Sequence, residues 1–245
     1  MTEHTGDISA TENPYESGMV ETLRRTVAVL GKRNIPYWID CGTLLGLIRD
    51  QRIIPWDEDV ELGAWTRDKS LFDACLPDFL EHGLVITVDK PKKLGLALSD
   101  GQPYKFRILF YDVLDGHAVR GGLVGGSFLG RVVSYIGNLL DDALCPVNPG
   151  VSKMRTMLIQ CTRFVPHPLI HFSLTVLKRL PLKARPRFKI SERLFRETSP
   201  VEFYGFDVLV PSAAEEYLAF RYGDGWDQPT RYWIDHADVA DMRHK

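Results

Sequence analysis

Apolar residues recur at helical and at strand spacings in alternating stretches of the chain. After Pro14 they lie three or four positions apart until Gly31, which predicts an amphipathic helix. Similar patterns predict a helical turn over 43–50, a helix over 71–80 and a C-terminal helix that opens on a capping box at Ser212. Strands are predicted at 37–39, 57–62, 84–88, 94–98 and 104–113, with a strand or loop pair at 201–210. Helices interleaved with a few strands predict an α/β or α+β fold.

The same patterns divide the chain into four parts. Residues 1–13 are polar and small and are predicted to be a disordered tail, and 14–120 hold most of the predicted helices and strands. Residues 121–196 begin with a Gly-rich apolar stretch and continue into a basic one, so we interpret them as an insertion. Residues 197–245 are then the C-terminal part of the core.

The composition is rich enough in apolar residues for a hydrophobic core, and the charged residues are distributed unevenly along the chain. Apolar residues make up 44% of the 245-residue chain, which is typical of a globular protein. The net charge is −2, but residues 153–196 contain eleven Lys or Arg and one acid, so this segment is +10 and the remainder is −12. The segment suits an anionic membrane surface or an anionic acceptor. The alternative is a solvated basic face that neutralises the acidic remainder. Whole-chain charge gives no reason to expect nucleic acid.

Hydropathy and cysteine spacing favour a cytoplasmic protein. The uncharged runs at 121–130, 132–140 and 164–177 are all shorter than the roughly 18 apolar residues of a spanning helix. The N-terminus lacks a basic region followed by an apolar one, so it does not resemble a secretory signal. Four scattered cysteines without CxxC pairing are typical of reduced thiols. We expect the protein in the cytoplasm, with peripheral contact at the inner face of the membrane through 153–196.

Candidate chemistry lies in residues 40–63. If 57–62 form a strand, Asp57, Asp59 and Glu61 project from one face about 6.6–6.8 Å apart. Carboxylates so close repel one another, and a hard divalent cation such as Mg²⁺ (or Mn²⁺) relieves the repulsion. The alternative is an acidic, solvated strand.

Residues upstream of the acids favour a phosphate site. Gly42 permits close backbone approach, and Thr43 places a hydroxyl and an amide near the start of a short helix. Arg49 adds a planar donor fork that suits phosphate oxygens. Trp56 can stack on a base or sugar, or it can be a core residue. Together these residue types predict a site for a metal-bound nucleotide diphosphate.

The order Gly-Thr-Leu-Leu-Gly, Arg, Ile-Pro-Trp-Asp-acid-Asp over 42–63 resembles the signature of the LicD/fukutin family. The resemblance covers roughly 20–115 and 200–230, and Cys41 and Glu61 depart mildly from the family pattern. It implies a nucleotidyltransferase fold, a small mixed sheet flanked by helices, here with a helical basic insertion. It also implies Asp59 and Glu61 as the core metal acids, Asp57 as an additional acid, and a third acid from a neighbouring strand, for which Asp112 is the candidate.

The family's chemistry is transfer of a phospho-substituent from a CDP-activated donor, such as CDP-choline or CDP-ribitol, to a hydroxyl of a glycan or lipid-linked glycan, with release of CMP. By this resemblance Asp59, Glu61 and Asp112 are the expected catalytic residues, and Asp57, Asp59, Glu61 and Asp112 the expected metal ligands. Asp112 is also the expected base for the acceptor hydroxyl. Two alternatives stay open, an NTP-dependent nucleotidyltransferase that releases pyrophosphate and a non-catalytic binding protein of the same fold.

Overall fold

A computed structural model describes residues 13–101, 103–125 and 184–229. Its helices are α1 (Glu16–Lys32), α2 (Cys41–Asp50), α3 (Lys69–Ala74), α4 (Leu76–Glu81) and α8 (Ala214–Tyr222), with 3-10 turns η1 (Thr66–Asp68) and η2 (Glu192–Phe195). Its strands are β1 (Trp38–Ile39), β2 (Asp59–Trp65), β3 (Leu84–Lys90), β4 (Lys93–Leu98), β5 (Lys105–Leu114), β6 (His117–Gly125), β7 (Ala184–Ser191), β8 (Thr198–Phe203) and β9 (Phe206–Pro211).

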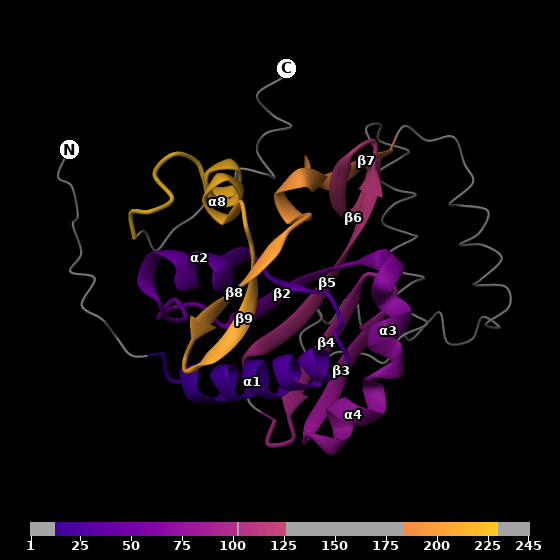
Figure 1. Ribbon diagram of the computed structural model, residues 1–245, viewed down its shortest axis with the longest axis vertical. Helices are drawn as coiled ribbons and strands as arrows, with labels where there is room; N and C mark the ends of the chain where they lie inside the picture. Colours follow the sequence, from indigo (N-terminus) through magenta and orange to yellow (C-terminus); the bar gives the residue numbers. More distant parts are fainter. Residues whose placement is uncertain (1–12, 102, 126–183, 230–245) are drawn as a thin grey trace, which may run out of the picture.

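The strands form a mixed seven-stranded sheet and a separate hairpin. The sheet runs β1-β2-β5-β4-β3, and β6 pairs with both β5 and β7. Strands β2 and β5 are parallel, and the other pairs are antiparallel. Strands β8 and β9 make the hairpin. Helices flank the sheet (Figure 1). The prediction of an α+β fold with a mixed sheet flanked by helices is therefore confirmed.

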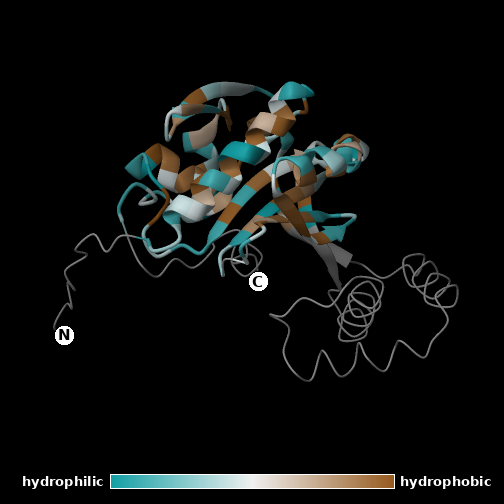
Figure 2. Cartoon of the chain, turned by 90° about the horizontal axis from the view of Figure 1, so that it is seen from below, coloured by the Kyte–Doolittle hydropathy of each residue, from teal (hydrophilic) through white to brown (hydrophobic). Residues whose placement is uncertain are grey.

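One face of the sheet packs on helices from the first half of the chain. Val60 of β2 pairs with Phe106 of β5, so their side chains lie on the same face, together with Phe110 further along β5. Phe72 of α3 meets Phe110 edge-on with 5.2 Å between ring centroids. Helix α1 contacts β3, β4 and β5. Polar and apolar residues alternate along the helices and strands (Figure 2), as this packing requires.

The opposite face carries an aromatic cluster at one end. Trp38 of β1 stacks on Phe195 of η2 with 4.8 Å between centroids, and it lies 5.5 Å from Tyr111 of β5. Gly63 lies directly under Trp38, because a Cβ added there would be 2.2 Å from the indole ring. The C-terminal helix α8 closes the cluster through Tyr217, whose ring centroid is 5.0 Å from that of Phe195. The last part of the chain thus completes the core that the first part begins.

Element boundaries depart from the predictions in three places. The strand predicted from Asp57 begins at Asp59, because residue 57 is in a turn. The helix predicted over 71–80 is two short helices, and the second has a proline in its first turn. The capping box predicted at Ser212 is wrong, because α8 has no side-chain cap and the Ser212 hydroxyl hydrogen-bonds Ser199 instead.

Only parts of the predicted tail, insertion and C-terminal region lie among the described residues. The ends of the predicted insertion belong to β6, β7 and η2, while 126–183 and the C-terminal residues 230–245 lie outside the described residues. Residues 1–12 of the predicted tail also lie outside them, and Asn13 is buried. Of the helices that the structure describes, none has the length and apolar character needed to cross a membrane.

Candidate functional site

The start of α2 is fixed to β2 by hydrogen bonds. The backbone N–H of Asp40 donates to the carbonyl of Glu61 at 3.0 Å, and the N–H of Glu61 donates to Thr43 Oγ1 at 2.9 Å. Asp40 is the N-cap, and its carboxylate accepts from the N–H of Cys41. These bonds hold the first turn of α2 beside the acidic strand.

Two of the predicted acids project side by side from β2. Asp59 and Glu61 alternate with the buried Val60 and Leu62, as a strand half-covered by helices requires. Their side chains are 29% and 16% exposed, so both are open to solvent. The strand periodicity therefore placed these two carboxylates correctly on one face.

The third predicted acid of this stretch, Asp57, reaches the same place from the preceding turn. Its Oδ1 accepts from the N–H of Asp59 at 3.0 Å. Its Oδ2 lies against Gly42, only 2.5 Å from where a Cβ would be, so no side chain fits at 42 without displacing the carboxylate. Burial, with added repulsion from Asp59 and Glu61, raises the pKa of Asp57 to about 6. Asp57 thus lies beside the start of α2 and is repelled by Asp59 and Glu61.

Cations from β5 face the acids. Because β2 and β5 are parallel, Arg107 is directly opposite Glu61, and its guanidinium contacts both carboxylates, at 2.9 Å from Asp59 Oδ2 and 3.4 Å from Glu61 Oε1. Lys105 lies 3.8 Å from Asp59. Sequence reasoning missed Arg107. The alternating polar positions of 105 and 107 on an otherwise apolar strand were the available signal.

Asp112, the predicted third acid, does not lie with this group. The register pairs Leu62 with Ile108, so the even-numbered residues of β5 share the Val60 and Leu62 side of the sheet, away from Asp59 and Glu61. Asp112 is half exposed and makes an ion pair with Lys92. The Asp112 carboxylate is therefore solvated and has its own cationic partner.

The remaining predicted binding residues have structural contacts. Thr43 is buried and its hydroxyl holds the N–H of Glu61. Trp56 packs against the core. Arg49 has a buried side chain that makes two hydrogen bonds to its neighbour Asp50, at 2.9 and 2.6 Å, rather than to the acids. Of the four predicted phosphate and nucleotide contacts, the structure brings only Gly42 and Thr43 to the acids.

A buried polar cluster adjoins the acids, and no periodic pattern along the chain predicts it. Asp40 is fully buried and accepts from two phenols, Tyr111 and Tyr217, each at 2.6 Å. Burial raises the pKa of both tyrosines and of the Cys41 thiol well above their ordinary values. All three groups are therefore neutral, so the phenols act as donors and Cys41 is no nucleophile.

The three acids suit a metal cation that is coordinated partly by the protein and partly by a bound ligand. Mg²⁺ is usually bound by one or two carboxylates together with substrate phosphates, and Asp57, Asp59 and Glu61 offer oxygen atoms of that kind. Within the described ranges, no three His, Cys, Asp or Glu side chains converge closely enough to hold a metal by themselves. Ligand oxygens would therefore have to complete the coordination.

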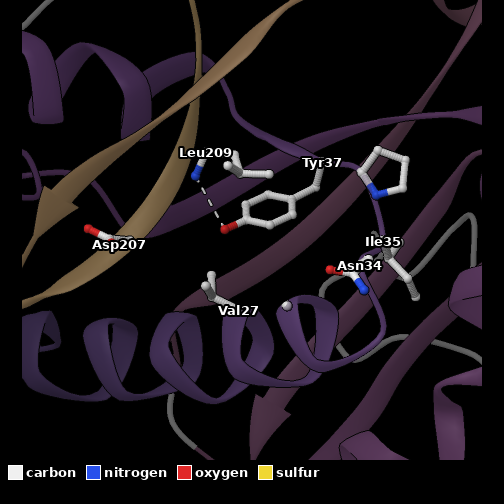
Figure 3. A pocket seen from close by; sticks show the side chains of 8 residues that line it. Val27, Asn34, Ile35, Tyr37, Asp207 and Leu209 are labelled. Carbon is white, nitrogen blue, oxygen red and sulfur yellow. Dashed lines mark hydrogen bonds between the residues drawn. The ribbon is translucent and has the colours of Figure 1, made fainter.

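A shallow groove lies between the C-terminal part of α1 and β9 (Figure 3). Its lining includes Val27, Ile35, Tyr37, Asp207 and Leu209, and none of the candidate acids. The Tyr37 hydroxyl accepts from the N–H of Leu209 at 3.3 Å, and burial raises the pKa of Tyr37 to about 12. The groove is thus a place where α1 and β9 pack together, and the Tyr37 hydroxyl in it already has a hydrogen-bond partner.

Comparison with known proteins singles out the same stretch. Residues 34–89 match the LicD/FKTN/FKRP nucleotidyltransferase domain. An uncharacterised protein of Rickettsia typhi is 32% identical over 100 residues, covering 38% of this chain and 32% of that protein. Human ribitol 5-phosphate transferase FKRP is 48% identical over 48 residues (20% and 10%). Human ribitol-5-phosphate transferase FKTN is 31% identical over 114 residues (44% and 24%).

The matched segments therefore span at most about a third of these relatives' own lengths. Among solved structures, the antibiotic-resistance factor ANT(2'')-Ia is similar at 13% identity over 66% of this chain and 92% of that one, with a TM-score of 0.34. That score is too low to carry an argument. By sequence, residues 34–89, which contain Gly42, Asp57, Asp59 and Glu61, are similar to the LicD/FKTN/FKRP nucleotidyltransferase domain.

Proposed function

We propose that the protein is a metal-dependent phosphotransferase. It moves a phospho-substituent, phosphocholine or a phospho-alditol, from a CDP-activated donor to a glycan hydroxyl and releases CMP. The observation that carries the proposal is the placement of Asp57 against Gly42 and the N–H of Asp59, with Asp59 and Glu61 on one face of β2, in the segment that matches the family. The names of FKRP and FKTN, both ribitol phosphate transferases, support this transfer chemistry.

The acids have a clear electrostatic task in such a reaction. Displacement at phosphorus develops negative charge on the diphosphate, and catalysis consists largely of positioning and charge stabilisation. Asp57, Asp59 and Glu61 would hold Mg²⁺ (or Mn²⁺), which supplies that stabilisation when bound. Gly42 lets the first turn of α2 approach Asp57 closely. Arg107, which pairs with Asp59 and Glu61, carries a planar donor fork that would suit the oxygens of a diphosphate bound there.

The test is a product analysis with purified protein and Mg²⁺. CDP-ribitol, CDP-glycerol, CDP-choline and CTP are supplied in turn with a glycan acceptor, and CMP is quantified against pyrophosphate. CMP release that requires Mg²⁺ supports the proposal. Release of pyrophosphate from CTP would contradict the proposal and indicate a nucleotidyltransferase. Tight binding of a CDP-donor without turnover would indicate a non-catalytic binding protein of the same fold.

Two aspartates on the two faces of the sheet make a matched pair for this assay. Asp59→Asn is expected to abolish turnover while the protein stays folded, because it removes a metal-binding carboxylate. Asp112→Asn is expected to retain activity within about twofold of the parent, because its side chain lies on the other face and pairs with Lys92. An Asp59→Asn protein that remains active would contradict the assignment of Asp59 as a metal-binding carboxylate.

The basic segment 153–196 remains a proposed contact for an anionic membrane or a lipid-linked acceptor. Its support is the charge of +10 counted from the sequence. Co-sedimentation with vesicles that contain or lack anionic lipid tests it. Binding that needs anionic lipid and weakens with salt supports the contact, and salt-insensitive or absent binding contradicts it.

A further inference from the structure

The side chain of Asn13 lies against the turn that carries Asp57. Asn13 precedes the first helix of the chain, and it is only 6% exposed. Its Nδ2 donates to the carbonyl of Asp57 at 2.7 Å and to the carbonyl of Ile54 at 3.3 Å. These partners are 44 and 41 residues away in sequence. Asn13 therefore makes a long-range contact directly behind a candidate metal acid.

The other end of the Asn13 amide sets its orientation. Asn13 Oδ1 accepts from the N–H of Tyr15 at 2.9 Å, and the backbone carbonyl of Asn13 accepts from the N–H of Glu16 at the start of α1. Because the amide oxygen already has a donor, the amide nitrogen faces the two carbonyls, which can only accept. The start of α1 thus directs the Asn13 amide at the turn of residues 54–57.

The turn that carries Asp57 is short, and Asn13 contacts both of its ends. The N–H of Asp57 donates to the carbonyl of Ile54 at 3.0 Å, which makes a β-turn with Pro55 in its second position. The Ile54 carbonyl also accepts from Asn13, and so does the Asp57 carbonyl. Asn13 therefore links the first residue of the turn to the last and fixes the backbone at Asp57.

The Asp57 carboxylate lies where it would not stay by itself. Burial and repulsion from Asp59 and Glu61 disfavour its charge. Its Oδ1 accepts from the N–H of Asp59 at 3.0 Å, and its Oδ2 is only 2.5 Å from where a Cβ at Gly42 would be. A side chain reaches only the space around its own backbone. A fixed backbone at Asp57 therefore keeps the carboxylate in this narrow place.

We propose that Asn13 is a positioning residue for Asp57, because it holds the turn of residues 54–57 so that the carboxylate lies beside Gly42 and can bind the metal. The metal in this proposal rests on the proposed function, whereas the positioning of Asp57 does not. Asn13 contacts the backbone of the turn and acts on the site through Asp57. Its effect on metal binding should therefore disappear when Asp57 is replaced.

Amide hydrogen exchange of the full chain in EDTA tests the positioning without a metal. The N–H of Asp59 reports on the Asp57 carboxylate that accepts it, and the N–H of Glu61 is an internal reference because Thr43 holds it. Asn13→Ala is expected to speed exchange at Asp59 at least about tenfold and to leave exchange at Glu61 within about twofold of the parent. Asn13→Asp keeps an acceptor oxygen but cannot donate when ionised, so the same change is expected.

Tyr204→Phe is the matched control, because it removes a contact near the other end of the same loop. The Tyr204 hydroxyl accepts from the N–H of Ile53 at 2.8 Å and donates to Glu16. This variant should keep the Asp59 N–H protected, since Asn13 still holds the turn. Should Asn13→Asp fail to fold because of its buried charge, Asn13→Ala decides. Parent-like exchange at Asp59 in Asn13→Ala overturns the proposal, and so does equal exchange in Asn13→Ala and Tyr204→Phe.

Binding of CDP at a series of Mg²⁺ concentrations, followed by calorimetry, measures the consequence for the site. Asn13→Ala is expected to raise the Mg²⁺ concentration for half-maximal binding at least about fivefold. In an Asp57→Asn background the same substitution should change it by less than about twofold, because the positioned group is gone. An equal effect in both backgrounds contradicts action through Asp57. CDP binding to the parent that does not depend on Mg²⁺ contradicts the proposed function instead, and hydrogen exchange still decides the positioning.

Discussion

At the residue scale, Asp57 is held where its charge is unfavourable. Its carboxylate is enclosed between the first turn of α2 and the N–H of Asp59, with Asp59 and Glu61 as negative neighbours. A group of this kind destabilises the folded protein in its charged form. Such a cost is typical of sites built for a cation, because a bound cation turns the repulsion into attraction.

This cost predicts how stability depends on pH. The folded-state pKa of Asp57 is raised to about 6, above its unfolded value near 3.8, so the folded state binds the proton more tightly. The contribution of Asp57 to stability is therefore greatest below pH 4, falls as the pH rises to about 6, and stays low above. Asp57→Asn, which cannot ionise, is expected to be more stable than the parent above pH 6 by about 1–3 kcal/mol after solvent screening.

Urea unfolding at pH 5, 6, 7 and 8 without divalent cations measures this difference. Asp112→Asn is the control, since its side chain is half exposed and paired with Lys92. The gain for Asp57→Asn should grow between pH 5 and pH 7. A pH-independent difference, or a variant less stable than the parent at pH 8, would contradict the strained carboxylate.

Gly42 tests the same contact from the other side. A Cβ at 42 would be 2.5 Å from Asp57 Oδ2, whereas one at Gly31 of α1 meets nothing within 4 Å. Gly42→Ala should displace the carboxylate and lower Mg²⁺-dependent turnover at least about tenfold, as expected when a positioned group moves by an ångström. Gly31→Ala should keep full activity and add about 0.5–1 kcal/mol of stability. Equal activity in the two variants would show that Asp57 needs no fixed position.

At the scale of elements, pairing between strands decides which residues meet. The alternation of acid and apolar residues predicted that Asp59 and Glu61 share a face, because that is a property of one strand. It could not predict that β5 runs parallel to β2 with Arg107 opposite Glu61, because register is a property of two strands. The placement of Asp112 depends on the same register. Its strand was predicted, but the register puts its side chain on the side of the sheet away from Asp59 and Glu61.

A hydrogen bond between a side chain of α2 and the backbone of β2 links these two elements. Its removal is expected to destabilise the folded protein. Thr43 Oγ1 accepts the N–H of Glu61 at 2.9 Å inside the core. Thr43→Val keeps the volume but leaves that N–H without a partner, so a loss of about 1–3 kcal/mol is expected. Thr43→Ser keeps the hydroxyl and loses only a methyl group. Urea unfolding should find Thr43→Val the less stable of the two, and the reverse order would assign Thr43 a packing role alone.

At the scale of the whole molecule, distant parts of the chain meet on Asp40. The carboxylate joins the start of α2 to Tyr111 of β5 and to Tyr217 of α8, which is 177 residues away in sequence. Local periodicity predicted α1, β5 and α8 as elements because each has its own apolar pattern. Local periodicity cannot predict a buried carboxylate that three elements share, because a local pattern does not show which polar groups from distant parts of the chain become buried together.

The bond between Tyr217 and Asp40 therefore predicts how firmly the C-terminal part is held. A phenol that donates to a buried carboxylate contributes about 1.5–3 kcal/mol, so Tyr217→Phe should loosen α8 and lower the protection of its amides from hydrogen exchange. The effect should shrink in an Asp40→Asn background, because the acceptor is then uncharged. Phe220→Ala, at a position on α8 that is 46% exposed, is the control and should leave α8 protected. If Tyr217→Phe and Phe220→Ala expose α8 equally, packing of the aromatic cluster rather than the shared carboxylate holds the two parts together.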